Sequence, residues 1–368
     1  MATPTFTLRI ADWTTVQAEV DSYESATVIA RHNDVSTWEL VLPTSSPAAR
    51  ALIDASRPRL LVYAAGQVWR SGPVIRLERS VDADGDLLTV SGVDDLVWLR
   101  RRLAHPQPGT AAPPYSTTES DDRTGAASQV IAGYVNRNAG PLAVAARQVP
   151  GLSVPTPAAF GATVTASARY EPLLTFVQQI ATAARVGIRV RDLVFEVFQP
   201  AGAAVFSVEL GTLASWTSHV EAPETTYVYV AGGGVGTARL IREYADAAAV
   251  LDWGRVEAFR DRRDSTDTAE LDQSGAETLA EGAHPPGVAM QALDVPGQSF
   301  LTDWNVGSVA TVYLGDATIT DVIVEAQVTL QPNEPARVAP VVGSPMIDLA
   351  QWRALQAQSR RLRQLERI

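Results

Sequence analysis

The chain of 368 residues is 46% hydrophobic and 19% charged, a composition that predicts two or three folded domains and excludes a disordered chain. It contains no cysteine, which excludes disulfides, thiolate metal sites and cysteine nucleophiles, and no run approaches the roughly 20 apolar residues that span a bilayer. The formal net charge of −11 disfavours stable binding to nucleic acid, which requires clustered positive charge.

Residues 1–102 alternate apolar and polar side chains in short runs separated by turns, which is typical of a small β-barrel. The clearest hairpin surrounds Asp84-Gly85, because alternation on both sides of an Asp-Gly pair is a strong hairpin signal. Asp94 and Asp95 are predicted to cap a short helix with arginines at its end, the charge order that a helix dipole favours. Strands are predicted at 5–10, 26–31, 37–42, 60–63, 67–70, 74–81 and 87–90, and a helical turn at 46–55.

Residues 103–122 form a proline-rich loop in which the other residues are mostly small or polar. A loop of this length between compact elements is usually functional or a boundary. We interpret it as the exit from the first domain and as an exposed contact surface.

An α+β insertion is predicted over residues 123–200. Helical spacing begins after Asp122, a suitable cap, and a second helix is predicted over 172–185. A hairpin is predicted across Arg191-Asp192.

The strand pattern returns in residues 201–344, which we predict to be a second β-barrel domain. Residues 345–368 predict a C-terminal helix, which at three heptads is near the lower limit for a coiled coil. The predicted fold class is therefore mainly β, with two barrel-like domains, an α+β insertion and a final helix. The second domain has predicted strands at 205–208, 226–230, 238–244, 255–260, 288–292, 308–314, 318–324 and 327–330, and a helix at 267–280.

A glycine cluster, Gly232-Gly233-Gly234-Val235-Gly236, follows a predicted strand and raises the alternative of a dinucleotide-binding loop. Thr237 stands where that motif has its third glycine, and no convincing helix follows. We predict a glycine-rich hairpin and no cofactor site.

Glu257 and Asp261 have the residue types of a glycosidase acid pair, and His219 and Glu221 lie nearby in the sequence. A catalytic pair needs a cleft and a set separation, whereas arginines surround these acids, so we favour a salt-bridged strand edge. The acidic run 82–86 is too short for an EF-hand, and we expect a turn there. The histidines lack metal-ligand spacing and there is no G-x-S-x-G elbow, so we expect no metal and no catalytic residue. The histidines are His32, His105, His219 and His284.

Several motifs, in order along roughly residues 1–345, resemble those of tail-tip hub proteins of long-tailed phages, related to the Tal (tail-associated) minor tail proteins. In one of them Ser308 replaces the usual aspartate, so that match is weaker. The motifs are Gly72-Pro73-Val74 with Glu78; Leu88-Thr89-Val90-Ser91-Gly92 with Asp94 and Arg101; Thr124-Gly125 with Tyr134-Val135 and Asn138; Thr226-Tyr227-Val228-Tyr229-Val230-Ala231-Gly232 with Arg239; Trp253-Gly254-Arg255 with Glu257, Phe259 and Asp261; and Asp303 with Val306-Gly307, Val309 and Val312.

This resemblance implies a structural protein of the virion tail tip, the baseplate hub of a siphovirus, with two tube-forming barrels in each chain. Three copies would form a ring below the hexameric distal tail protein, meet the C-terminus of the tape-measure protein and other tip or receptor-binding proteins, and open for DNA ejection into the host. DNA would pass without specific binding, along a lumen that we expect to be acidic because like charge does not trap it. We expect synthesis in the host cytoplasm, no membrane insertion and no cofactor. Candidate trimer contacts on the final helix are Trp352, Leu355, Leu362 and Leu365.

Two other classes of function remain as alternatives. A cell-wall-degrading hydrolase of the tail tip would usually carry an extra domain after the hub, and only about 25 residues follow the second predicted barrel. A carbohydrate-binding module for host recognition fits the eight tryptophans, but these are scattered along the chain rather than clustered. We therefore expect a structural protein and no enzyme.

Overall fold

The computed structural model describes residues 5–13, 15–83, 85–263, 265–283, 287–315 and 317–343. Most of its regular structure is β, and the largest sheet has 13 strands. Within that sheet, residues before 94 form the first β unit and residues after 203 form the second β unit. The strands are β1 (Phe6–Ala11), β2 (Val16–Glu19), β3 (Ser25–Arg31), β4 (Thr37–Pro43), β5 (Arg59–Ala64), β6 (Gln67–Asp82) and β7 (Gly85–Val93), then β12 (Ala204–Phe206), β13 (Leu213–His219), β17 (Gly287–Ala292), β18 (Val309–Leu314), β19 (Ala317–Leu330) and β20 (Arg337–Val342).

The sheet follows the order β13-β17-β20-β19-β3-β4-β7-β6-β5-β1-β2, with β18 joined to β19 and β12 joined to β18. β3 and β4 show why these segments are strands: each buries every second residue, so one side of the sheet is apolar and the other is polar. The mainly β fold predicted from the sequence is therefore confirmed.

The two β units, which we expected as separate barrels, share one sheet and one core. β3 pairs antiparallel with β19, from Arg31 opposite Glu325 to Ala26 opposite Leu330. A single cluster of buried apolar side chains continues through both units. Such pairing between distant segments depends on tertiary structure, and local alternation does not reveal it.

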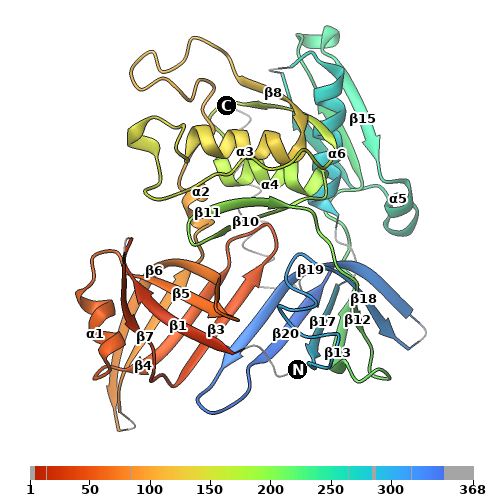
Figure 1. Ribbon diagram of the computed structural model, residues 1–368. Coiled ribbons are helices and arrows are strands. Elements are labelled where there is room, and N and C mark those ends of the chain that lie inside the picture. Colours follow the sequence, from red (N-terminus) through yellow and green to blue (C-terminus); the bar gives the residue numbers. More distant parts are fainter. Residues whose placement is uncertain are drawn as a thin grey trace.

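The first α+β unit lies above this sheet (Figure 1) and contains the two helices predicted in residues 123–200. Thr124 and Gly125 belong to a strand that pairs with Thr165 and Val164, so the helix begins later than we expected and Asp122 does not cap it. The hairpin across Arg191-Asp192 is confirmed. The elements are β8 (Asp121–Ala126), α3 (Ala127–Asn138), η1 (Ala145–Arg147), β9 (Thr163–Ala168), α4 (Leu173–Ala183), β10 (Gly187–Arg191) and β11 (Val194–Phe198).

A second α+β unit, not predicted as such, is inserted between β13 and β17 (Figure 1, upper right). Its central strand, residues 227–231, pairs antiparallel with strand 241–245 and parallel with strand 257–261. Helix 268–282, which agrees with the helix predicted over 267–280 and is capped by Asp267, covers this small sheet by packing Leu271 against Val228 and Val230. The elements are β14 (Tyr227–Ala231), η2 (Gly236–Ala238), β15 (Ile241–Ala245), α5 (Ala247–Trp253), β16 (Glu257–Asp261) and α6 (Thr268–Gly282).

Two short helices and a long loop complete the first β unit. Helix α1 (Pro47–Asp54) begins as predicted, with the Ser46 hydroxyl accepting the Ala49 N–H at 3.1 Å. Helix α2 (Val97–Arg100) follows β7 and leads into the proline-rich loop, which ends where β8 begins at Asp121. The base of this loop is fixed to the first α+β unit, because the His105 N–H donates to Asn138 Oδ1 at 2.9 Å.

Gly92 on β7 allows a close approach of the Trp38 ring. A Cβ at Gly92 would lie 2.1 Å from the nearest ring carbon, so we expect Gly92→Ala to displace Trp38 and to cost roughly 1–3 kcal/mol of unfolding free energy. Urea unfolding would measure this cost. Gly109→Ala is the control, because a Cβ there meets open space, and equal effects of the two changes would contradict the explanation.

Candidate functional site

Among the described residues, the strand path β13-β17-β20-β19-β3-β4-β7-β6 has an open sheet edge at each end, on β13 and on β6. β13 pairs only with β17, and residues 75–82 of β6 pair only with β7. Long open edges are uncommon in natural proteins because they offer unpaired N–H and C=O groups to other chains. These two edges are therefore candidate assembly sites.

Both edges carry exposed apolar side chains on the side of the sheet that is buried elsewhere. Trp216 on β13 lies opposite the buried Met290 and is 41% exposed. Leu77 on β6 lies opposite the buried Val90 and is 42% exposed, and Val81 on the same side is 69% exposed. The apolar layer therefore reaches both edges without a covering element in the described part of the chain, although on β6 Arg79, which pairs with Asp86 at 2.6 Å, interrupts it between Leu77 and Val81.

A buried ion pair within the first β unit lies at its junction with the first α+β unit. Arg59 and Asp95 are 3% and 0% exposed, and their N–O distance is 2.6 Å. Asp95 also accepts hydrogen bonds from the Ser71 hydroxyl at 2.5 Å and the Trp98 indole at 3.1 Å. The Ser71 hydroxyl in turn accepts the Asp192 N–H at 2.8 Å, which fixes the β10–β11 turn to the sheet.

Asp95 therefore does not cap the short helix as the sequence suggested. Its carboxylate turns into the protein toward Arg59, and only Asp94 accepts a local backbone N–H, that of Leu96 at 3.2 Å. Sequence reasoning missed this site because a paired Asp-Asp before a helix has the same appearance whether it caps or is buried.

Two further buried groups near this junction have strongly shifted pKa values. Burial, opposed by the Ser36 hydroxyl and the Arg70 guanidinium, raises the pKa of Asp94 to about 6. Burial, together with the charge of Arg189, lowers the pKa of His32 to about 4. His32 packs edge-on against Phe198, so both groups lie where the units meet.

We expect these two groups to act oppositely on stability. The raised pKa of Asp94 contributes stability below pH 4 that is lost as the pH rises through 6, about 3 kcal/mol. The lowered pKa of His32 contributes stability above pH 6.5 that is lost as the pH falls through 4, also about 3 kcal/mol. The measured quantity is the unfolding free energy of each variant minus that of the unmodified protein, from urea unfolding. Between pH 4 and pH 7 this difference should rise for Asp94→Asn and fall for His32→Gln. Changes of the same sign in both variants would contradict this assignment.

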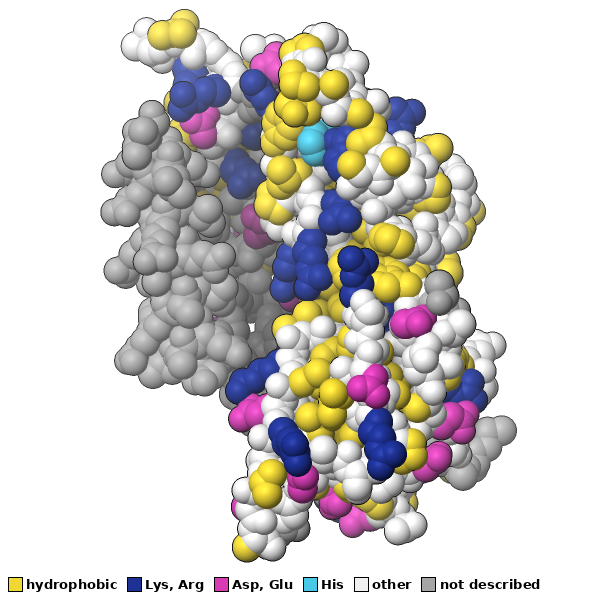
Figure 2. All heavy atoms as spheres, turned by 90° about the vertical axis from the view of Figure 1, so that its left-hand side faces the viewer, with side chains coloured by type: hydrophobic (Ala, Val, Ile, Leu, Met, Phe, Trp, Pro, Cys, Tyr) yellow, Lys and Arg dark blue, Asp and Glu magenta, His cyan; other side chains and the backbone are white. Residues whose placement is uncertain are grey.

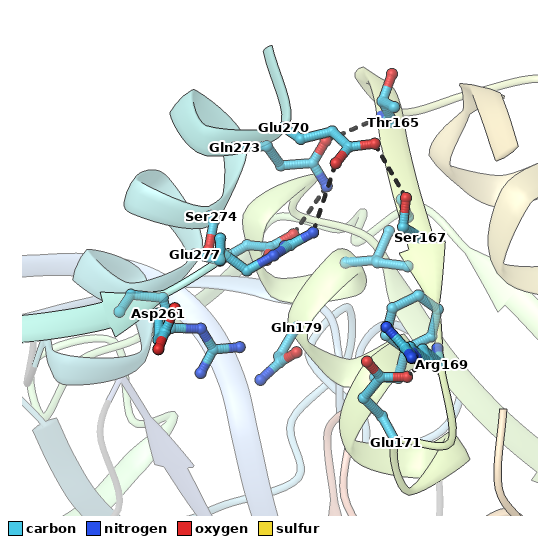
Figure 3. A pocket seen from close by; sticks show the side chains of 15 residues that line it. Thr165, Ser167, Arg169, Glu171, Gln179, Asp261, Glu270, Gln273, Ser274 and Glu277 are labelled. Atoms are coloured by element: carbon cyan, nitrogen blue, oxygen red, sulfur yellow. Dashed lines mark hydrogen bonds and ion pairs between the residues drawn. The ribbon is translucent and has the colours of Figure 1, made fainter. Parts of the chain in front are cut away.

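A polar cavity of about 270 Å³ lies between α4 and β9 of one α+β unit and α6 and β16 of the other (Figure 3). Gln273 accepts the Thr165 N–H at 2.9 Å, and Glu270 accepts the Ser167 hydroxyl at 3.0 Å. Burial raises the pKa of Glu277, to which Gln273 donates at 2.8 Å. These hydrogen bonds join the two units, so we interpret the cavity as part of a polar seam between them.

The predicted salt-bridged strand edge at Glu257 and Asp261 is confirmed. Glu257 pairs with Arg255 at 2.6 Å, and Asp261 pairs with Arg239 and Arg263. The two acids lie four residues apart on β16, a separation of roughly 13 Å. That distance exceeds the roughly 5–9.5 Å between the carboxyl groups of glycosidase pairs.

The predicted glycine-rich hairpin is also confirmed, since β14 and β15 pair directly on either side of Gly232–Gly236. The described residues contain no group of three or more acidic or histidine side chains that would hold a metal ion. Within the same residues no helix is long and apolar enough to cross a membrane. His284, Asp84 and the candidate trimer contacts in residues 345–368, where the sequence predicts a helix, lie outside the described residues.

The fold is that of phage tail proteins. It is similar to the tail protein of Neisseria meningitidis MC58 (TM-score 0.58, 11% identity, covering 92% of this chain and 96% of that chain). It is also similar to the 43 kDa tail protein of prophage MuSo2 from Shewanella oneidensis (TM-score 0.56, 9% identity, 92% and 97% covered) and to prophage tail protein gp18 of Listeria monocytogenes EGD-e (TM-score 0.55, 12% identity, 96% and 98% covered).

The chain belongs to the family described as Siphovirus ReqiPepy6 Gp37-like protein, which matches residues 8–344. It is therefore a structural protein of the phage tail or baseplate. No curated protein matches the sequence significantly.

Proposed function

We propose that this protein is the hub of a siphovirus tail tip and that three copies close into a ring. The observation that carries this proposal is the pair of open edges at opposite ends of one eight-stranded path. Every neighbouring pair along this path is antiparallel. Because the number of strands is even, β6 of one copy meets β13 of the next in antiparallel orientation as well, and the sheet closes head to tail.

The joint between β19 and β3 shows what a contact between copies requires. There, apolar residues of both strands face one another and are buried, as Val28 is opposite Val328. At the joint between copies, Leu77 and Val81 on β6 of one copy would face Trp216 on β13 of the next copy. A closed ring thus covers the apolar side chains that a single copy leaves exposed.

A ring of three copies is consistent with the presence of two β units in each chain. The three copies place six such units around the ring, the number needed below a hexameric distal tail protein. Twenty-four strands, tilted as in other barrels, enclose a backbone diameter of roughly 45–50 Å. This width admits a DNA duplex after side chains are added, so the ring serves as the end of the tail tube.

The lumen in this arrangement differs from the acidic wall that we expected. The side of the eight-stranded path away from the core carries mainly small polar side chains, and several of its charges are paired, whereas in the described part of the chain Glu39 accepts only a hydrogen bond from Ser91. Arg31 lies 3.0 Å from Glu325, and Arg76 lies 2.5 Å from Glu78. We therefore propose a polar wall with little net charge, which still lacks the basic clusters that hold DNA.

The remaining contacts complete the proposal. The ring would adapt the hexameric distal tail protein to a trimeric tip, meet the end of the tape-measure protein and open for DNA ejection. The exposed part of the loop at 103–122 is the proposed contact with neighbouring tail proteins, and the helix predicted from the sequence of residues 345–368 remains a proposed trimer contact. We propose no enzymatic activity, because the acid pair that suggested a hydrolase lies in a salt-bridged strand edge.

Light scattering of the purified protein, with negative-stain images of the same sample, tests this function. We expect a trimer that appears as a ring with a central hole. A zymogram on bacterial cell walls tests the alternative, and clearing of the wall would overturn the purely structural function. A monomer at all concentrations that also fails to join tails in vitro would overturn the hub.

A further inference from the structure

A pocket rich in arginine and tryptophan lies where the first β unit meets helix α2. Its volume is about 380 Å³, and Trp13, Arg57, Arg59, Trp98, Arg101 and Arg102 supply its polar lining. Proline and valine side chains form the rest of its wall. Figure 2 shows arginine side chains gathered at mid-height on this face of the molecule.

Consecutive contacts with aromatic rings hold two arginines of this pocket, Arg59 and Arg101, in place. The Arg59 guanidinium lies 5.6 Å from the Trp13 ring, the Trp13 and Trp98 rings are 5.1 Å apart, and Arg101 lies 4.9 Å from Trp98. Stacking uses the flat surfaces of the guanidinium groups and leaves the N–H groups at their edges available. The tryptophan rings, in contrast, already have partners on their surfaces.

Several hydrogen-bond donors of the pocket have no partner among the described residues. Trp13 Nε1 and Arg59 Nε are both buried donors without an acceptor. The Arg59 side chain as a whole is almost fully buried. Unsatisfied buried donors are uncommon in native structures and indicate a missing acceptor. Arg102 donates only to the main-chain oxygens of Arg147 and Arg101, which leaves its charge without a carboxylate partner there.

The described lining of the pocket contains no acidic side chain, although the whole chain is strongly acidic. Four arginines therefore line one small volume, and among them only Arg59 has a carboxylate partner in the described part of the chain, the buried Asp95. An oxyanion would satisfy the free donors and neutralise this local charge.

We propose that this pocket binds carboxylate side chains of an acidic peptide segment from another protein of the tail. Planar carboxylates match the forked donors of arginine, and the proline and valine wall suits the apolar parts of a peptide. Single-stranded nucleic acid is disfavoured, because its bases require free aromatic surfaces and those of Trp13 and Trp98 are occupied. The pocket meets β6 only at Pro73 and Val74, next to the open edge and away from Leu77 and Val81, and the proposed binding does not require closure of the ring.

The test uses the full chain and a labelled ten-residue peptide of alternating glutamate and alanine, with fluorescence anisotropy as the readout. A peptide with glutamine in place of glutamate and a ten-nucleotide single-stranded DNA are the comparison probes. Arg57→Gln combined with Arg101→Gln removes two pocket charges. Arg50→Gln combined with Arg137→Gln removes two exposed charges elsewhere and is the matched control.

We expect the glutamate peptide to bind and the glutamine peptide not to bind. The pocket variant should weaken binding by about tenfold or more, while the control variant stays within about twofold and both variants keep the mass of the unmodified protein. Equal weakening by the two variants, or no binding of the glutamate peptide, would overturn the proposal. Tighter binding of the DNA with the same dependence on Arg57 and Arg101 would instead make the pocket a nucleic-acid site and overturn the proposal as well.

Discussion

Trp216→Lys should convert the proposed trimer to a monomer without unfolding the chain. Trp216 is exposed in a single copy but lies on the apolar side of the open β13 edge. In the ring it would be buried against β6 of the next copy, and a buried lysine without a partner is strongly unfavourable. Lysine on an edge strand is also the residue by which natural proteins prevent edge-to-edge pairing.

Light scattering measures this effect as a threefold fall in mass at micromolar concentration, and circular dichroism shows that the fold is retained. Val81→Lys on the β6 edge should act in the same way, because it alters the other half of the same joint. Leu142→Lys is the matched control, since Leu142 is also an exposed apolar side chain but lies on neither edge. If Leu142→Lys dissociates the trimer and Trp216→Lys leaves it intact, the edges do not form the joint.

Asp95→Ala should cost roughly 3–5 kcal/mol of unfolding free energy, the largest effect that we expect from a single substitution. It leaves the Arg59 guanidinium buried without its carboxylate, and such a charge is far more costly than an exposed one. It also removes the acceptor for Ser71, whose hydroxyl holds the β10–β11 turn. We expect the first α+β unit to become more accessible to proteases.

Urea unfolding measures this cost, and the combined change Arg59→Met with Asp95→Leu should recover most of it because no charge remains buried. Asp34→Ala is the control, because the Asp34–Arg100 pair is exposed and such pairs contribute at most about 1 kcal/mol. A cost for Asp95→Ala that is no greater than that for Asp34→Ala would show that the buried pair does not stabilise the junction.

The local elements of this protein could be predicted from its sequence because their patterns are short. The alternation in β3 and β4, the Ser46 cap of α1 and the Asp267 cap of α6 each depend on a few neighbouring residues. β13 was missed because its exposed positions make it polar along most of its length, as expected for an edge strand that lacks its partner.

The long-range arrangement could not be predicted in this way. The β3–β19 joint and the parallel pairing of β14 with β16 bring together segments that no local pattern connects. The same limit applies to the candidate sites, because the open edges are defined by which strands do not pair. Asp95 shows the same limit of local patterns for a single residue, since its buried partner Arg59 lies 36 positions away in the sequence.

Disulfide cross-linking between the two edges tests the closed ring most directly, because the chain has no cysteine of its own. Ser80→Cys on β6 is combined in turn with Ser215→Cys and Thr217→Cys on β13, all on the side of the sheet away from the core. Thr27→Cys with Thr329→Cys, directly opposite at the β3–β19 joint, is the positive control and should close within one chain.

We expect oxidation of one edge pair to give covalent dimers and trimers and nothing larger, because a head-to-tail ring of three ends there. Ser80→Cys alone should give no trimer. A ladder that continues beyond three copies, or no cross-link from either edge pair while the control pair closes, would contradict the trimeric ring.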